Sequence, residues 1–445
     1  MKRNVSEARL LRGFRIGKLG VGLTGSYLGY QLQNLFFDDE RREQRRKSFQ
    51  NRASSKIREE LQSLKGPVMK LGQALSMQSH LLPEEMIAEL ANLQMRAPAM
   101  HPSLARAQFK ASFGKSPEEV FRSFTMEPFA AASLGQVHRA VTKAGEQVAV
   151  KIQYPAIRSA IENDFTLLRS AAFLGRLTGH IPESIISEME QGILQETDYL
   201  NEAKNTEFFR ERLKPLPYVR VPAVFRQFST DRVLTMSHLD GEPLMDFLAR
   251  KPSQELRNQI GVRLMTLFCY QMHALRALHA DPHPGNYLID ARGTIGLVDF
   301  GCVKKFSPEY IEVYQSFVEC VWLKGEDQYR RTERLMWGPQ VLKKPRVARK
   351  LLKDMIDFYK VLWPAPTAAR TVVDFSDGNT LKRISQLGNE CFRNKFQNPE
   401  FLFSSRAQVG LYNVLHLLRA KMDISAVWAD VKSTPSASEA RGATV

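Results

Sequence analysis

One stretch in the second half of the chain carries acidic and amide side chains at a spacing suited to phosphoryl transfer. It reads LHADPHPGNYLIDARGTIGLVDFG over 278–301 and contains His279, Asp281, Asn286 and Asp299. A β-hairpin is predicted between Asn286 and Asp299. Phosphoryl transfer requires a carboxylate beside the attacking oxygen and oxygen ligands that hold Mg²⁺ against the phosphates. We therefore predict that Asp281 orients or deprotonates the acceptor, while Asn286 and Asp299 bind the metal.

A lysine upstream has the position that such chemistry needs. The sequence VAVKIQ over 148–153 places Lys151 among apolar neighbours in a predicted strand, from which its ammonium group could reach the α- and β-phosphates. Many strands carry a solvated lysine, and a lone Asp-Phe-Gly or Asp-Pro turn is often only a turn. The combination of these elements along one chain favours the catalytic interpretation.

The elements that must position these residues follow from the apolar pattern. Helical spacing covers 57–94, and two alternating β-type runs separated by a turn predict a hairpin over 133–153. Helices are expected over 156–212 and short strands over 221–239, and the remainder is largely helical. We predict an α+β fold with a small strand-rich N-lobe and a larger helical C-lobe. The expected segments are a basic N-terminal segment at 1–56, a helical extension at 57–124, an N-lobe with inserted helices at 125–239, a C-lobe at 240–432 and a disordered tail at 433–445.

Composition narrows the possible partners. Lys plus Arg (63) exceed Asp plus Glu (47), which gives a formal net charge of +16 and favours anionic partners. The basic runs at 41–52 and 343–353 are either solvated helix faces or contacts with an anionic membrane surface. Aromatic residues are not interleaved with them, so a nucleic-acid partner is not expected. The four cysteines lie far apart, which predicts neither a zinc site nor a disulfide framework and fits a reducing compartment.

With these motifs in place, the chain resembles the UbiB/AarF/ADCK family of atypical kinases from about residue 57 to 425. Besides the Asp-x4-Asn and Asp-Phe-Gly elements, three motifs carry the likeness: an alanine-rich nucleotide loop, a K-x-G-Q motif, and an E-x-D segment followed by a further glutamate. Their residues are Ala130, Ala131, Ala132 and Ser133 in the loop, Lys70, Gly72 and Gln73 in the K-x-G-Q motif, and Glu196, Asp198 and Glu202 in the acidic segment.

The resemblance implies a bilobal protein-kinase-like fold in which the K-x-G-Q motif forms a lid over a site for ATP and Mg²⁺. On one continuous helix, Asp198 and Glu202 would share a face and Glu196 would point away. We assign Glu202 to Lys151, and Glu196 with Asp198 to the lid; exchanging Glu196 and Glu202 stays open, as does a merely solubilising role for all three. The hinge residues Met236 and His238 are added as nucleotide contacts.

The sequence after Gly301 indicates which class of phosphoryl acceptor to expect. It runs almost directly into an amphipathic helix, without the activation segment and A-P-E closure of typical protein kinases, so a peptide substrate is disfavoured. His279, Asp281, His283 and Asn286 also match the loop of small-molecule kinases. The expected function is an ATP-dependent phosphotransferase or ATPase that supports ubiquinone, other isoprenoid quinone or lipid metabolism. The alternative is a nucleotide-gated lipid-binding scaffold with little phosphotransfer.

The expected partners and location follow from the same resemblance. They are ATP, an unknown small-molecule or lipid acceptor, quinone-biosynthesis proteins, an anionic membrane surface and a possible second copy of the chain. No stretch reaches the roughly 20 apolar residues that a membrane-spanning helix needs. The longest candidate, 19–30, is short and glycine-rich. We expect a cytoplasmic protein that lies peripherally at the inner membrane if the source is a bacterium, and a protein of the mitochondrial matrix if it is a eukaryote.

Overall fold

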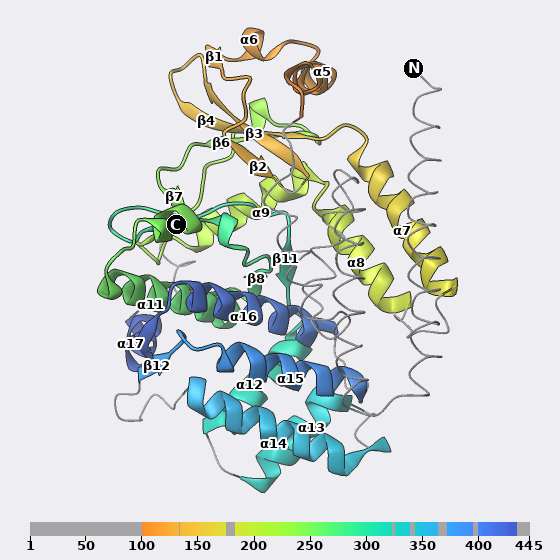
Figure 1. Ribbon diagram of the computed structural model, residues 1–445, viewed down its shortest axis with the longest axis vertical. Helices are drawn as coiled ribbons and strands as arrows, with labels where there is room; N and C mark the ends of the chain where they lie inside the picture. The colour runs from red at the N-terminus through yellow and green to blue at the C-terminus, as the bar shows by residue number, and fades with distance from the viewer. Residues whose placement is uncertain are drawn as a thin grey trace, which may run out of the picture. The chain divides into compact units, whose positions relative to one another are not determined.

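The computed structural model describes residues 100–132, 134–174, 183–322, 325–338, 343–363, 372–394 and 399–433 (Figure 1). The predictions for the basic N-terminal segment, for Lys70, Gly72 and Gln73, for Ser133 and for the tail after Ser433 lie outside these residues. The chain divides into two compact units. The first unit extends to Leu200 and includes Phe225–Thr235, and the second comprises Asn201–Val224 and the chain from Met236 onward.

The first unit contains a five-stranded sheet with the order β1-β3-β4-β6, in which β2 also pairs with β3. The strands are β1 (Ser123–Phe124), β2 (Ala130–Ala132), β3 (Gly135–Val141), β4 (Gln147–Gln153) and β6 (Val233–Ser237). The predicted hairpin over 133–153 is confirmed: β3 and β4 are antiparallel, with Val137 opposite Lys151. Gly145 in the connecting turn has a φ of 93°, a backbone conformation that glycine adopts without steric cost.

Helices α5 (Pro102–Phe113) and α6 (Pro117–Val120) build the core of this unit with the sheet. Helix α5 begins with proline after the capping residue His101 and ends at Gly114, whose left-handed conformation lets its N–H donate to the Lys110 carbonyl. Phe109 and Phe121 are buried against apolar residues of β3, β4 and β6. Part of the stretch predicted as a helical extension therefore packs on the N-lobe sheet.

A chain of buried polar groups crosses the same sheet. His138 is fully buried, its Nδ1 lies 3.0 Å from the Thr125 carbonyl oxygen, and its Nε2 lies 2.9 Å from Gln136 Nε2. The Gln136 amide oxygen in turn accepts from the Met100 N–H at 2.8 Å. The carbonyl requires a proton on Nδ1 and the amide nitrogen requires an acceptor at Nε2, so this network holds the neutral imidazole.

Acidification should therefore destabilise this protein. Burial lowers the pKa of His138, so the unfolded chain binds more protons than the folded chain once the pH falls below about 6.5. The stability that comes from keeping this ring neutral is present above that pH and is lost as the pH falls. We expect the urea midpoint to drop between pH 7 and pH 5 in the wild type, and to drop less steeply in His138→Gln. Equal slopes for the two proteins would contradict this role.

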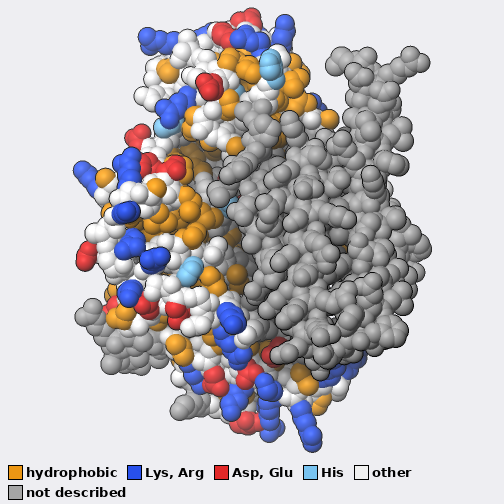
Figure 2. Space-filling view, in the orientation of Figure 1, with side chains coloured by type: hydrophobic (Ala, Val, Ile, Leu, Met, Phe, Trp, Pro, Cys, Tyr) orange, Lys and Arg blue, Asp and Glu red, His pale blue; other side chains and the backbone are white. Residues whose placement is uncertain are grey.

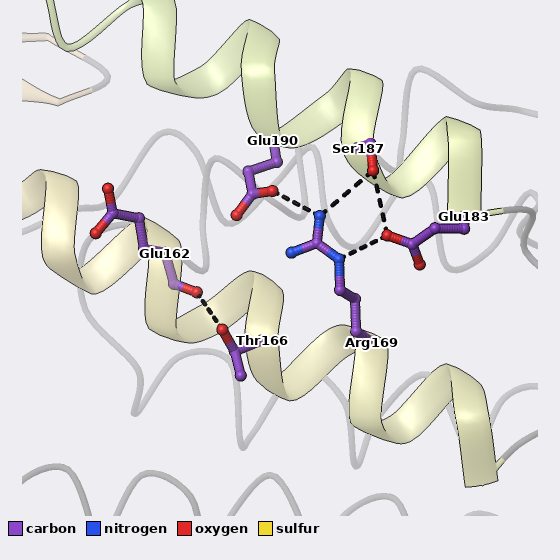
Figure 3. A network of polar contacts seen from close by, with 6 residues as sticks. All are labelled: Glu162, Thr166, Arg169, Glu183, Ser187 and Glu190. Atoms are coloured by element: carbon purple, nitrogen blue, oxygen red, sulfur yellow. Dashed lines mark hydrogen bonds and ion pairs between the residues drawn. The ribbon is translucent and has the colours of Figure 1, made fainter.

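Helices α7 (Ile157–Leu174) and α8 (Glu183–Gln195) pack side by side in the first unit, as expected from the helical pattern after residue 156 (Figure 1). Arg169 of α7 contacts α8 at two carboxylates, Glu183 at 2.7 Å and Glu190 at 2.6 Å, and also reaches Ser187 (Figure 3). These two partners raise the pKa of Arg169 and fix the register of one helix against the other.

The second unit combines short strands with eight helices among the described residues. One sheet has the order β5-β10-β9-β7, and two further pairs are β11-β8 and β12-β13. The strands are β5 (Val219–Arg220), β7 (Glu242–Pro243), β8 (Ala277–His279), β9 (Tyr287–Ile289), β10 (Ile295–Leu297), β11 (Val303–Lys305), β12 (Val372–Asp374) and β13 (Lys421–Asp423). The hairpin predicted between Asn286 and Asp299 is confirmed as β9 and β10.

The helices of this unit are α10 (Leu244–Ala249), α11 (Gln254–Tyr270), α12 (Pro308–Trp322), α13 (Glu326–Trp337), α14 (Pro345–Leu362), α15 (Asn379–Arg393), α16 (Pro399–Leu417) and α17 (Ile424–Ser433). Helix α9 (Tyr199–Arg212) begins in the first unit and continues into the second. The apolar faces of these helices share one core, in which α11 contacts α17 and α12 contacts α13 and α14. The predicted α+β class, strand-rich toward the N-terminus and helical toward the C-terminus, is confirmed.

Basic side chains gather over α13 and α14, at the lower end of the view in Figure 2. Along α14, Arg346, Arg349, Lys350 and Lys353 are exposed, while the opposite face of the helix is buried. Arg349 contacts Glu326 and Lys350 contacts Asp354, each within 2.7 Å. This run thus lies on the exposed face of a helix, which both expected roles require, so the choice between a solvated face and a contact with an anionic surface stays open. Within the described residues, no helix has the length and apolarity required to cross a membrane.

Candidate functional site

The loop after β8 brings together Asp281, the predicted acceptor residue, and Asn286, a predicted metal ligand. Asp281 follows directly on β8, and the Asn286 side-chain amide donates to the Asp281 carbonyl at 2.9 Å and to its carboxylate at 3.2 Å. These bonds orient the amide of the buried Asn286 with its nitrogen toward Asp281, so its oxygen faces the other way. The loop therefore offers one half-exposed carboxylate and one oriented amide oxygen.

The Asp-Phe-Gly element is hydrogen-bonded to the same loop. His279 Nε2 lies 2.7 Å from the Asp299 carbonyl oxygen, which can only accept, so Nε2 carries the proton. Asp299 has a φ of 63°, a left-handed conformation that is uncommon outside glycine and is often retained at functional sites. Its carboxylate accepts from the Gly301 N–H at 3.2 Å. The buried Phe300 anchors the turn in the core, and its carbonyl accepts from Asn205 of α9 at 3.1 Å.

Two features that sequence reasoning missed hold this loop. A π-helical turn, Gln271–Leu275, ends α11, and the buried Gln271 side chain accepts from the His279 backbone N–H at 2.7 Å. Arg276 follows in a left-handed conformation and redirects the chain into β8. A π-helical turn commonly marks a functional site, but no residue pattern in this segment predicts one.

The second missed feature is a close contact between α16 and the loop. Gly410 of α16 faces Pro282, and a Cβ added to Gly410 would lie 2.2 Å from the Pro282 Cγ. Real Cβ atoms essentially never approach so closely, so this position accepts only glycine unless the helix or the loop moves. Gly410 thereby sets how near α16 lies to the residue that follows Asp281.

In the first unit, Lys151 lies on β4 with a side chain that is 5% exposed. Its ammonium nitrogen is 5.0 Å from the centroid of the Tyr199 ring, a cation–π contact with a fully buried residue. Gly135 permits this packing, because a Cβ there would lie 2.3 Å from the Ile152 carbonyl oxygen and 2.8 Å from the Tyr199 hydroxyl. Tyr199 and Gly135 were not among the predicted site residues.

The alanine-rich segment forms strand β2 rather than an irregular loop. Ala130 pairs with Val137, Ala131 with Gln136 and Ala132 with Gly135, so the segment is one arm of a tight hairpin with β3. Ala130 and Ala131 are exposed and Ala132 is partly exposed. Methyl groups are therefore accessible to solvent along this strand, where a glycine-rich loop would leave the backbone bare.

The prediction that Glu196, Asp198 and Glu202 lie on one continuous helix is wrong. Helix α8 ends at Gln195 and α9 begins at Tyr199, so Glu196 and Asp198 lie in the turn between them and share no helix with Glu202. Thr197 ends α8 by bonding the Leu194 carbonyl through its hydroxyl at 2.6 Å, and Asp198 accepts from the Leu200 N–H at 3.1 Å. Such local bonds from Thr and Asp compete with helix continuation.

The three acidic residues differ in burial. Glu202 is fully buried in α9, Glu196 is half-buried and Asp198 is exposed. Of the two predicted hinge residues, Met236 is buried at 8% exposure and forms an isolated bridge with Val224. His238 is half-buried, and its Nδ1 lies 3.9 Å from the Asp240 carboxylate.

The donor set of the second unit fits Mg²⁺ that is bound together with phosphates. The described residues contain no group of three or more His, Cys, Asp or Glu side chains that could hold a metal by themselves. Mg²⁺ is typically held by one or two carboxylates together with substrate phosphates rather than by an all-protein cage. The Asp299 carboxylate and the Asn286 amide oxygen match that requirement in type and number.

A two-unit α+β chain, in which a His-x-Asp-x4-Asn loop is hydrogen-bonded to an Asp-Phe-Gly element, is a protein-kinase-like protein. The ABC1 atypical kinase-like domain matches residues 92–331. The chain therefore belongs to the ABC1 atypical kinase-like family, which confirms the UbiB/AarF assignment made from the motifs.

Several named relatives are similar to this chain. It is 35% identical over 263 residues to Protein ACTIVITY OF BC1 COMPLEX KINASE 7, chloroplastic, from Arabidopsis thaliana. This alignment covers 58% of this chain and 38% of that protein. It is 29% identical over 407 residues to Atypical kinase COQ8B, mitochondrial, from Rattus norvegicus, in an alignment that covers 89% of this chain and 75% of that protein. It is 30% identical over 275 residues to Atypical kinase COQ8, mitochondrial, from Saccharomyces cerevisiae, in an alignment that covers 60% of this chain and 54% of that protein.

The matched part is often a fraction of the relative. The match covers 38% of the Arabidopsis protein and 51% and 47% of two uncharacterised proteins from Synechocystis.

Among solved structures, Rv3197 from Mycobacterium tuberculosis, determined in complex with erythromycin, aligns with a TM-score of 0.55 at 23% identity. That alignment covers 87% of this chain and 98% of the other, and it supports the fold alone.

Proposed function

We propose that this chain binds Mg²⁺-ATP and transfers or hydrolyses its terminal phosphate. The observation that carries the proposal is the hydrogen-bonded pair of elements in the second unit. Asn286 is tied to Asp281, and His279 is tied to the carbonyl of Asp299, so one carboxylate for the acceptor and two metal ligands are held by a common set of bonds. Positioned groups of these types are what phosphoryl transfer requires of a protein.

Each residue of the loop has a distinct role in this proposal. Asp281 orients the acceptor hydroxyl or water and takes up its proton. Asn286 and Asp299 would hold the metal, which would supply positive charge that neutralises the phosphates. The left-handed backbone of Asp299 is fixed by His279 and Gly301, so the carboxylate is oriented before a ligand arrives. Such preorganisation lowers the cost of assembling charges around the phosphates.

Lys151 contacts the α- and β-phosphates in this proposal, and Glu202 is its carboxylate partner. Both side chains are withdrawn from water, at 5% and 0% exposure, and a buried charge is costly unless it is paired or hydrogen-bonded. The same burial favours Glu202 over Glu196 as the partner and leaves Glu196 and Asp198 as contacts for Lys70 and Gln73.

The hairpin of Ala130, Ala131 and Ala132, with Ser133, covers the phosphates, and Met236 and His238 contact the base. The two strands β2 and β3 are joined by a very short connection, so the exposed alanine methyl groups would face the nucleotide where a kinase glycine loop presents bare backbone. This arrangement supports a nucleotide-binding mode distinct from that of ordinary protein kinases.

We propose a small molecule or lipid as the acceptor. Only β11 and a few residues separate Gly301 from the start of α12 at Pro308, which leaves no extended platform for a peptide. A role in isoprenoid quinone metabolism at a membrane surface is supported by the resemblance to the UbiB family and by relatives that bear the name COQ8. The exposed basic face of α14 would suit an anionic surface.

The decisive experiment measures phosphate release by the purified chain with Mg²⁺-ATP and anionic liposomes. Asp281→Asn should reduce turnover by at least about 100-fold, within the range attributed to general acid–base catalysis, while ATP affinity stays within a few-fold of wild type. If the variant keeps wild-type turnover, Asp281 is not the acceptor-side carboxylate. If wild type shows lipid-stimulated binding without turnover, the chain acts as a nucleotide-gated scaffold instead.

A further inference from the structure

A pocket lies among the helices of the second unit, and none of its lining residues belongs to the phosphate-handling loop. It is formed mainly by α11, α12, α14 and α16 and is partly open to solvent. Eight of its seventeen lining side chains are Phe, Tyr or Trp. Aromatic and apolar walls of this kind are typical of sites that bind small molecules.

Several polar groups of the lining are hydrogen-bonded to other protein groups. Tyr310 and Ser404 share a hydrogen bond, and the Tyr359 hydroxyl donates to the Gln408 amide oxygen at 2.8 Å. The Gln408 amide nitrogen donates in turn to the Tyr412 hydroxyl at 2.9 Å. Apart from a histidine, no lining side chain is ionisable near neutral pH. A charged ligand would therefore enter this pocket without a counter-charge, at a high desolvation cost.

We propose that this pocket binds an uncharged, flat, apolar group, of which a single aromatic ring is the simplest form. Phe317 and Tyr359 already meet edge to face in its wall, with ring centroids 5.3 Å apart and planes at 89°. Such edges and faces are complementary to a further ring. Val318, Trp322 and Ser405 are only partly buried, which gives a ligand a route from solvent.

The site is independent of the proposed phosphotransfer. Its lining contains none of Asp281, Asn286 or Asp299, so loss of metal binding at Asp299 should leave the pocket intact. Failure of the proposed function and failure of this proposal are thus distinguishable. An Asp299→Asn variant that loses nucleotide binding should still bind the apolar ligand.

Two tryptophans in the wall provide a direct readout. Trp322 and Trp363 both line the pocket, so bromobenzene, whose heavy atom quenches indole fluorescence, serves as the probe. In the full-length chain we expect saturable quenching, reversed by toluene and unaffected by benzoate at the same concentration. Val318→Phe should fill the pocket and weaken the apparent affinity at least ten-fold. Val361→Phe, on the exposed side of α14 and outside the lining, should leave it unchanged.

Several outcomes would overturn the proposal. Quenching that rises linearly with bromobenzene and never saturates in wild type would show that no such site exists. Equal quenching in wild type and Val318→Phe, with both proteins folded by circular dichroism, would place the probe elsewhere. Displacement by benzoate as effective as by toluene would refute the uncharged class of ligand. Because saturation and displacement are measured on wild type alone, the test holds even if Val318→Phe fails to fold.

Discussion

Asp299→Asn is expected to abolish Mg²⁺-dependent nucleotide binding. The substitution keeps the size of the side chain and an acceptor for the Gly301 N–H, but it removes the negative charge that the metal requires. Because changes in residues that only support a metal ligand already cost about 10–100-fold, loss of the ligand charge itself should weaken binding by more than about 100-fold. Calorimetric titration of a non-hydrolysable ATP analogue, with and without Mg²⁺, measures the effect.

The matched control lies in the hairpin between the two proposed metal ligands, Asn286 and Asp299. Asp290 accepts from the Arg292 and Thr294 N–H groups at 2.8 Å each, and asparagine keeps an oxygen for these bonds. Asp290→Asn should therefore bind the nucleotide as wild type does. If Asp299→Asn still binds the nucleotide as tightly as wild type and in a Mg²⁺-dependent way, Asp299 is not a metal ligand.

Gly410→Ala is expected to damage both stability and turnover. The added methyl group would lie 2.2 Å from the Pro282 Cγ, so α16 or the loop that carries Asp281 must shift. Overpacking of this kind typically costs about 1–3 kcal/mol, and a displaced Asp281 should lower turnover by at least ten-fold. Chemical unfolding and phosphate release measure the two effects.

Gly388 of α15 provides the control for Gly410. It is also a helical glycine, but a Cβ there would meet nothing within 4 Å. Gly388→Ala should be neutral or stabilising by up to about 1 kcal/mol, because alanine is the better helix former. If the two alanine variants change stability in the same direction and by the same amount, the contact between α16 and Pro282 does not constrain the loop.

Local sequence patterns were sufficient to predict much of the fold and of the loop that carries Asp281 and Asn286. Alternating residues predicted the β3–β4 hairpin that carries Lys151, and the spacing from Asp281 to Asp299 predicted the β9–β10 hairpin. Both depend on neighbours within about 20 residues, where side-chain periodicity and turn residues determine the conformation. The motif residues of the second unit accordingly lie in one hydrogen-bonded loop.

The errors and omissions have a different origin. The segment from Glu196 to Glu202 has a composition that suits a helix, but the bonds of Thr197 and Asp198 to the backbone interrupt it. The contact of Gly410 with Pro282 joins residues far apart in the chain, and a glycine within a helical pattern gives no indication of its partner. Tertiary contacts of this kind leave no periodic signal in a single sequence.

The most direct test of the central claim is a crystal structure of the chain with Mg²⁺ and a non-hydrolysable ATP analogue. We expect a metal bound by oxygens of Asp299, Asn286 and the phosphates at about 2.1 Å, with the Lys151 ammonium group on the α- or β-phosphate. A nucleotide bound without contact to Asp299, or with Lys151 far from the phosphates, would contradict that claim.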